Sequence, residues 1–312
     1  MLQPGVGYVE RGGLRLRYRV EGQGPICLAH PGGPGADSRY FFDLAGLSTF
    51  LTVIFFDPRA SEGSSASPDP TRYELPDYAA DVEALRLHLG LEQFILLGHS
   101  HGGFVAQEYA LTYPHRLSHL ILANTTPSLS GEGALRLAAA VEKRQNEPWY
   151  PAARSAFDKL WAGQFETGRE LGELVAGELP FFFPEWNEAA QRYGANFEGI
   201  TVNVDAVRHF NLVEAPRFNF RPRLPEIQVP TLVLTGENDF ICDVPSAREL
   251  ASLIPNAELC VMPGCGHYTF VDNPELFRET IRHFLDRSAR GEHSRPLVGG
   301  AVKQRSGGKA YP

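Results

Sequence analysis

Long apolar runs are missing from the sequence: none reaches the length of about 18 residues that a membrane-spanning helix needs. The first residues, MLQPG, carry neither the basic nor the apolar region of a signal peptide, so we expect a cytoplasmic protein that does not bind membranes. An excess of positive charge is missing too, because the formal net charge is −8. Since phosphate backbones are bound by basic surfaces, this charge argues against nucleic acid as a partner.

Cysteine is scarce, with 4 in 312 residues, and no two form a CxxC pair. This absence excludes the usual spacing of zinc ribbons and of thioredoxin-like redox motifs. We expect Cys27, Cys242, Cys260 and Cys265 to be buried free thiols. Cys242 and Cys265 are the one pair expected to come close, because they follow the two late strands described below, but a reducing compartment disfavours a disulfide.

The composition that remains is that of an ordinary globular protein, with 43% hydrophobic and 21% charged residues. A chain of this length can bury one large core and carry an inserted subdomain. Its end differs, because from Arg287 onward basic residues are mixed with repeated Gly and Ser and a single acidic residue, Glu292. Such a segment cannot bury a core, so residues 288–312 are predicted to be a flexible basic tail.

Strand-like and helix-like segments alternate along the first part of the chain. Residues 8–10 and 14–20 predict a β-hairpin joined at Gly12-Gly13, and the alternation then continues to about Leu122. Alternation of this kind predicts an α/β fold, with a mainly parallel central sheet and helices on both faces. We expect its core to comprise residues 1–125 and 229–287.

The most informative motif surrounds Ser100. The apolar run Phe94–Leu97 predicts a buried strand, and the pentapeptide GHSHG, residues 98–102, connects it to a helix predicted over 104–113. This layout is typical of a nucleophile elbow, in which glycine-sized neighbours permit a strained turn that exposes the serine hydroxyl. We therefore predict that Ser100 is a nucleophile.

A serine nucleophile needs a histidine base and an acid that orients the base, and in this type of fold the acid comes second along the chain. The strand predicted over 231–235 runs into Gly236-Glu237-Asn238-Asp239. We assign the acid to Asp239, which lies at the expected offset from the strand and its glycine. Glu237 and Asp243 remain alternatives, as does a simple turn role for Asp239.

The predicted general base is His267. It follows a strand predicted over 259–262 and the glycine turn 263–266, and none of the other nine histidines has this setting. Because the carboxyl ends of parallel strands meet at one edge of a sheet, Ser100, Asp239 and His267 could converge there. The only close histidine pair, His99 and His101, has no evident carboxylate partner, so we expect no metal and no cofactor.

A glycine-rich segment, HPGGPG at residues 30–35, follows another apolar strand. Bare backbone beside a nucleophile can supply the N–H groups that stabilise the negative oxygen of acyl transfer. We nominate the N–H groups of Gly33 and His101 as this oxyanion hole. A phosphate loop would end in lysine, which residues 36–38 lack, whereas an ordinary tight turn stays open as an alternative.

Between residues 126 and 228 the alternation stops, and helix-like stretches rich in aromatic residues take its place. We predict that this segment is a helical cap that closes a pocket over the catalytic edge. Its best candidates for the pocket wall are Phe181, Phe182, Phe183 and Trp186.

With these motifs in this order, the chain resembles an α/β-hydrolase, and HPGGPG resembles most closely the proline iminopeptidase branch of that superfamily. The segment FFDPR at 55–59 and the return RPRLPEI at 221–227 add to the resemblance. The sequence departs from the family at Ala60 and Glu62, where glycines are usual, and at His101, where iminopeptidases commonly carry Trp.

The resemblance implies a serine hydrolase that works through an acyl-enzyme, most simply an aminopeptidase that releases N-terminal residues from short peptides. Such an enzyme must bind a protonated amine, so one or two cap carboxylates should point inward. The candidates are Glu166, Glu170, Glu173, Glu178, Glu185, Glu188, Glu198, Asp205 and Glu214. A carboxylesterase or lactonase acting on small apolar acyl substrates is the alternative, and a non-catalytic ligand receptor on the same fold is a remote one.

Overall fold

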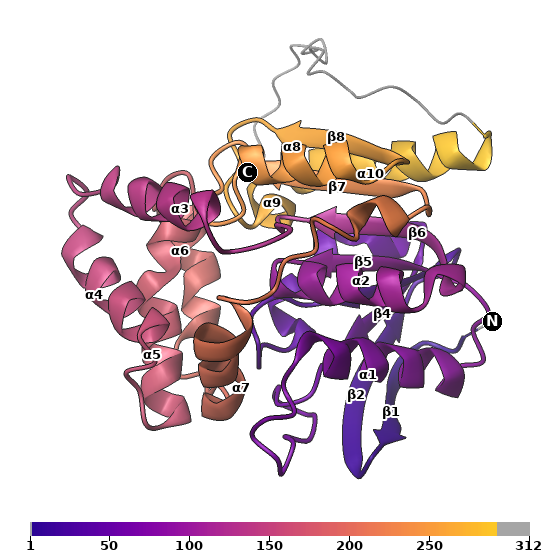
Figure 1. Cartoon of the computed structure of the whole chain (residues 1–312), viewed down its shortest axis with the longest axis horizontal. Helices are drawn as coiled ribbons and strands as arrows, with labels where there is room; N and C mark the ends of the chain where they lie inside the picture. The colour runs from indigo at the N-terminus through magenta and orange to yellow at the C-terminus, as the bar shows by residue number, and fades with distance from the viewer. Residues whose placement is uncertain (1, 292–312) are drawn as a thin grey trace, which may run out of the picture.

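The computed structural model describes residues 2–291 and contains one eight-stranded sheet in the order β1-β2-β4-β3-β5-β6-β7-β8 (Figure 1). The first three strands in this order pair antiparallel and all later neighbours pair parallel, which confirms a mainly parallel sheet that begins with a hairpin. The strands are β1 Gly5–Arg11, β2 Leu14–Glu21, β3 Ile26–His30, β4 Thr52–Phe56, β5 Phe94–His99, β6 Leu117–Ala123, β7 Thr231–Gly236 and β8 Ala257–Met262.

The inner strands are buried on both faces because nearly every residue in them is apolar. Successive side chains of a strand point to opposite faces, so Leu96 joins the apolar cluster on one face while Ile95 and Leu97 join the cluster on the other. Parallel strands covered by helices on both sides show this continuous apolar pattern rather than strict alternation.

Helices cover each face of the sheet. The helices α1 Leu75–His88, α2 His101–Thr112 and α8 Val244–Leu253 contribute to the first cluster. The second cluster receives α9 Thr269–Asp272 and α10 Pro274–Ala289, together with the short 3₁₀ segments η1 Ser38–Phe41 and η2 Leu44–Thr49. The predicted arrangement of helices on both faces is confirmed.

Five helices are inserted between β6 and β7, and they gather on one side of the sheet, at the left of Figure 1. They are α3 Glu132–Glu142, α4 Tyr150–Trp161, α5 Gly168–Glu178, α6 Glu188–Gly194 and α7 Val204–His209. Two smaller apolar clusters connect α3, α4, α5 and α7, and one of them includes Phe240 from the loop after β7. Helix α6 instead packs into the second core cluster through Ala190 and Tyr193. The segment between α5 and α6 also contacts the core, because the N–H of His267 donates to the carbonyl of Phe182 at 2.8 Å.

Helix α10 continues to Ala289, so the predicted tail begins slightly too early in the sequence, and residues 292–312 lie outside the described residues. All four cysteines are free thiols, and three are buried as expected, whereas Cys260 is only partly buried. Among residues 2–291, no helix is long and apolar enough to cross a bilayer.

Candidate active site

Ser100 joins the end of β5 to the start of α2, and its backbone is strained. Its φ of 56° and ψ of −120° lie outside the regions that L-residues normally occupy. A Cβ at Gly98 would lie 2.2 Å from the carbonyl oxygen of Gly102, so the turn can close only with glycine at this position. The sharp, strained turn between strand and helix that GHSHG predicts is therefore the observed local structure.

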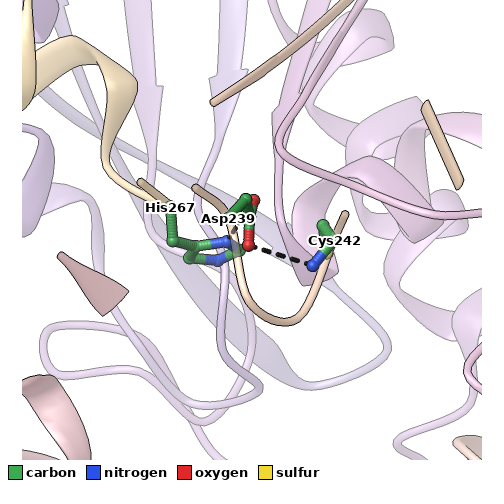
Figure 2. Close-up of side chains that lie close together, drawn as sticks. All are labelled: Asp239, Cys242 and His267. Carbon is green, nitrogen blue, oxygen red and sulfur yellow. Dashed lines mark hydrogen bonds and ion pairs between the residues drawn. The ribbon is translucent and has the colours of Figure 1, made fainter. Parts of the chain in front are cut away.

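Asp239 and His267 form a buried hydrogen-bonded pair at the ends of β7 and β8. The Nδ1 of His267 lies 2.9 Å from Oδ2 of Asp239. The backbone N–H groups of Ile241 and Cys242 donate to Oδ1 of Asp239 at 3.1 and 3.0 Å, and Figure 2 shows the carboxylate between the imidazole ring and Cys242. The carboxylate is fixed in place from two sides, so it holds the imidazole in one orientation and one tautomer.

The two alternative acids have other partners. Asp243 caps α8 by accepting from the N–H of Ser246 at 3.0 Å, and it pairs with Arg136 at 2.5 Å. Glu237 accepts from the N–H of Gly264 at 3.1 Å on the exposed side of the turn. Of the three carboxylates considered, only Asp239 bonds to His267.

Asn124 is a third residue bonded to the Asp239–His267 pair, and the sequence analysis did not predict it. Its side-chain amide donates to Oδ2 of Asp239 at 2.9 Å and to the carbonyl of Gly266 at 3.1 Å. The hydroxyl of Thr269 donates in turn to Oδ1 of Asn124 at 2.7 Å. Its position in the sequence could have indicated it. Asn124 directly follows β6, and β6 lies in the sheet between β5, which leads to Ser100, and β7, which leads to Asp239.

The turn that carries Ser100 is hydrogen-bonded to the loop of His267 through His99, the residue that precedes Ser100. The Nε2 of His99 donates to the backbone carbonyl of His267 at 2.9 Å, and the two rings lie 4.9 Å apart between centroids. Within residues 2–291, the Ser100 hydroxyl itself makes no hydrogen bond. The structure thus joins Asp239 to His267 directly. It joins the backbone of Ser100 to them through His99 and through Ala123 and Thr125, the two neighbours of Asn124.

A directional hydrogen-bond relay runs from His267 to the glycine-rich segment. Because Nε2 of His99 carries a proton, its Nδ1 accepts from the hydroxyl of Tyr40 at 2.8 Å, and the hydroxyl oxygen accepts from the N–H of Gly32 at 2.5 Å. Burial, aided by the nearby His267, lowers the pKa of His99 to about 3. His99 therefore stays neutral at ordinary pH, and the relay keeps its direction.

The glycine-rich segment lies against the nucleophile. A Cβ at Gly32 would lie 2.8 Å from the Cβ of Ser100, which leaves room only for bare backbone. Gly33 has a φ of 53°, and its N–H donates to no other group of residues 2–291. His101 is the first residue of α2, so its N–H lacks a partner within the helix. Both nominated oxyanion donors are thus unengaged.

The four predicted pocket residues differ in their contacts. Phe182 packs edge-on to the ring of His267 with centroids 5.2 Å apart. Phe181 packs against Phe240 at 5.7 Å in a cluster of the inserted helices, and Phe183 packs between Trp186 and Tyr268. Among these four, Phe182 is the residue that contacts the candidate catalytic pair.

One acidic side chain of the inserted helices is buried near the same place. Glu178, the last residue of α5, is 7% exposed, and its Oε2 has no hydrogen-bond partner within residues 2–291. Burial raises the pKa of Glu178 to about 8. Its charge in turn helps to raise the pKa of Tyr268, the residue that follows His267, although burial has the larger effect. Glu178 thus lies within electrostatic reach of the loop that carries His267 and Tyr268.

Among residues 2–291, two groups of side chains have the residue types of a metal site. In the first, Asp239, Cys242 and His267, the carboxylate and the imidazole already bond to each other, so this set does not suit a metal. The second comprises Glu74, His209 and Glu214, and there Oε2 of Glu214 accepts from the N–H of Leu75 at 3.2 Å. A separate open pocket of about 470 Å³, lined by Phe42, Tyr193, Phe270 and Arg278 among others, contains none of the candidate catalytic residues.

Comparisons with known proteins agree with this architecture. A family described as alpha/beta hydrolase fold matches residues 25–274, so the chain belongs to the α/β-hydrolase family and is a hydrolase. Within that family, the chain is 28% identical over 292 residues to "Proline iminopeptidase PfmaB" of Pestalotiopsis fici, covering 90% of this chain and 100% of that protein.

Solved structures show the same fold. The proline iminopeptidase of Mycobacterium smegmatis has a TM-score of 0.72 at 23% identity, covering 92% of this chain and 99% of that one. The enol-lactonase of Burkholderia xenovorans has a TM-score of 0.69 at 23% identity, covering 90% and 100%. The chain therefore resembles the proline iminopeptidase branch in sequence, whereas its fold is shared with lactonases as well.

Proposed function

We propose that the protein is a serine hydrolase in which Ser100, His267 and Asp239 form a catalytic triad. His267 removes the proton from Ser100, Ser100 attacks the substrate carbonyl, and the N–H groups of Gly33 and His101 stabilise the tetrahedral oxygen. His267 then gives that proton to the leaving amine or alcohol as its bond to the carbonyl carbon breaks, which leaves the acyl-enzyme. Water hydrolyses the acyl-enzyme, with His267 again acting as the base. The strained elbow at Ser100 and the 2.9 Å contact between His267 and Asp239 support this mechanism.

We propose further that the enzyme is an aminopeptidase of proline iminopeptidase type. The observation that carries this proposal is Glu178, a buried carboxyl group of the inserted helices with an unpaired oxygen near Tyr268. A protonated N-terminal amine would give that oxygen a charged partner and would favour its ionised form. The iminopeptidase relative at 28% identity supports the same assignment.

An esterase or lactonase acting on small apolar acyl substrates is the second candidate. It is favoured by the aromatic surroundings of His267, where Phe182 and Tyr268 pack against the ring. His101 also stands where iminopeptidases commonly carry Trp, so the acyl pocket differs from theirs.

The test compares wild type, Ser100→Ala and Glu178→Gln on a prolyl arylamide and on a short acyl ester. If the proposal is right, wild type hydrolyses the prolyl arylamide, Ser100→Ala does not, and Glu178→Gln loses about tenfold or more in kcat/KM on the amide alone. Turnover of the ester without the amide would establish the second candidate instead. Full turnover by Ser100→Ala would overturn the serine mechanism.

A further inference from the structure

Three buried polar rings lie together beside the nucleophile elbow. They are His30 at the end of β3, Tyr78 in α1 and His101 at the start of α2, and each is at most 3% exposed. The ring of Tyr78 packs edge-on against both histidines, with centroids 6.3 Å from His30 and 5.1 Å from His101. Strand β3 and helices α1 and α2 thus bring the rings of His30, Tyr78 and His101 together.

His30 contributes an unpaired hydrogen-bond acceptor to this group of three rings. Its Nδ1 donates to the carbonyl of Pro31 at 2.9 Å, so its Nε2 carries only a lone pair. That Nε2 is buried and has no hydrogen-bond partner within residues 2–291. Burial lowers the pKa of His30 to about 4, so the ring remains neutral and the acceptor remains free at ordinary pH.

The hydroxyl of Tyr78 is the second unpaired group. It is buried and has no partner among the described residues. The nearby guanidinium of Arg59 donates to Asp81 at 2.6 and 2.8 Å and so does not serve it. Because a buried polar group without a partner destabilises a fold, two such groups on adjacent rings indicate a place for a bound polar group.

His101 connects this group of rings to Ser100, because it is the next residue in the chain. Its backbone N–H is one of the two proposed oxyanion donors, and its ring packs against Tyr78 and against Phe210 at 5.0 Å. The ring makes no hydrogen bond within residues 2–291. Burial lowers the pKa of His101 to about 3, so it adds a neutral imidazole to the group. His101 thus places its ring beside Tyr78, while its backbone N–H lies in the first turn after Ser100.

We propose that His30, Tyr78 and His101 form a neutral polar subsite that binds a hydroxyl group on the acyl part of the substrate. A hydroxyl can donate to Nε2 of His30 and accept from the hydroxyl of Tyr78, so one group serves both unpaired atoms. Among residues 2–291, the cation near Tyr78 is Arg59, which already pairs with Asp81, so a carboxylate would find no free cation. An ammonium would find only Asp77 and Asp81, which already pair with arginines. This inference rests on the proposed acylation of Ser100. It adds the class of substrate, which is a compound with a hydroxyl group on its acyl part.

The experiment uses pairs of substrates that differ only in a hydroxyl in place of a methyl group. The nitrophenyl esters of β-hydroxybutyrate and isovalerate form one pair, and the arylamides of threonine and valine form the other. We expect wild type to prefer the hydroxylated member in kcat/KM by about tenfold or more, because the analogue leaves buried polar atoms unpaired. Tyr78→Phe should abolish this preference.

Tyr109→Phe is the matched control. It also removes a buried tyrosine hydroxyl, but that hydroxyl donates to Glu83 at 2.8 Å at the other end of α2, so the preference should persist. An equal rate on both members of each pair, unchanged by Tyr78→Phe, would overturn the proposal and assign the space to a buried water only.

A binding measurement separates this inference from the proposed function. Calorimetric titration of Ser100→Ala with the two esters should show tighter binding of the hydroxylated ester, and adding Tyr78→Phe should remove the difference. If wild type hydrolyses none of the substrates but the binding difference persists, the serine mechanism fails and the subsite stands. If hydrolysis occurs without any difference in rate or binding, the mechanism stands and the subsite fails.

Discussion

The Nε2 of His99 lies 2.9 Å from the carbonyl oxygen of His267, although 168 residues separate them in the sequence. This bond connects the turn that carries Ser100 to the loop that carries the candidate base. The same imidazole accepts from Tyr40, whose oxygen accepts from the N–H of Gly32. One neutral ring thus connects the turn of Ser100, the loop of His267 and the glycine-rich segment that carries Gly33.

Tyr40→Phe should lower kcat by about tenfold and leave KM nearly unchanged. Removal of the hydroxyl frees the N–H of Gly32 and the Nδ1 of His99, so the backbone that carries the Gly33 N–H is no longer held in position. Loss of an entire oxyanion donor lowers kcat by roughly 100- to 1000-fold, and a misplaced donor should lower it less. The measurement is steady-state kinetics on the prolyl arylamide or the short acyl ester, whichever wild type hydrolyses faster, with Tyr109→Phe as the control. A rise in KM at constant kcat would contradict the positioning role.

Asp239→Asn should reduce kcat by about 10⁴-fold while the fold stays intact. The amide oxygen would stay with the N–H groups of Ile241 and Cys242, so the NH2 group would face Nδ1 of His267 and donate to it. The imidazole then carries its proton on Nε2, which is the wrong tautomer for general-base catalysis, and its positive charge is no longer stabilised. Rates and thermal unfolding measured side by side test this expectation. Asp243→Asn is the matched control, because Asp243 caps α8 and pairs with Arg136, and its loss should lower stability with little effect on kcat. Comparable rate losses in both variants would count against Asp239 as the orienting acid.

Glu178→Gln should stabilise the protein increasingly as the pH rises. The pKa of Glu178 is raised from about 4.5 in the unfolded chain to about 8 in the folded one by burial. The folded state therefore prefers the protonated form. Its favourable contribution is complete below pH 4.5 and is lost, by roughly 1.4 kcal/mol per pH unit, between pH 4.5 and 8.

The measurement for Glu178 is urea unfolding of wild type and Glu178→Gln at several pH values. The difference between their free energies of unfolding isolates this side chain from others that titrate nearby, such as Asp272. Glu173→Gln, on the same helix but exposed, should show no such trend. A difference that does not change with pH would mean that Glu178 is not buried in its protonated form.

Gly98→Ala should destabilise the fold severely or prevent folding. Its Cβ would lie 2.2 Å from the carbonyl oxygen of Gly102, and neither backbone can move without distorting the elbow. Gly133→Ala is the matched control, because the nearest atom to its Cβ would be 3.6 Å away and alanine favours the helix α3 by about 1 kcal/mol. Thermal unfolding distinguishes them, and a Gly98→Ala protein with the wild-type melting temperature would contradict the observed turn.

The sequence alone located the strand ends and the motifs that follow them. Apolar runs bounded by glycine turns predict buried strands, and Ser100, Asp239 and His267 each follow such a run at close range. These local patterns need no knowledge of the rest of the chain. They predicted the mainly parallel sheet, the inserted helices and the pairing of His267 with Asp239 rather than with Glu237 or Asp243.

The tertiary structure alone decided which polar groups meet. Asn124 reaches Asp239 across 115 residues, Tyr40 reaches His99 across 59, and Glu178 is the acidic side chain of the inserted helices that lies buried near Tyr268. Each of these relations depends on the packing of distant elements, because a polar side chain has the same local sequence pattern whether it faces solvent or a buried partner. Strand positions follow from short-range periodicity, whereas hydrogen-bond partners and burial follow only from the folded core.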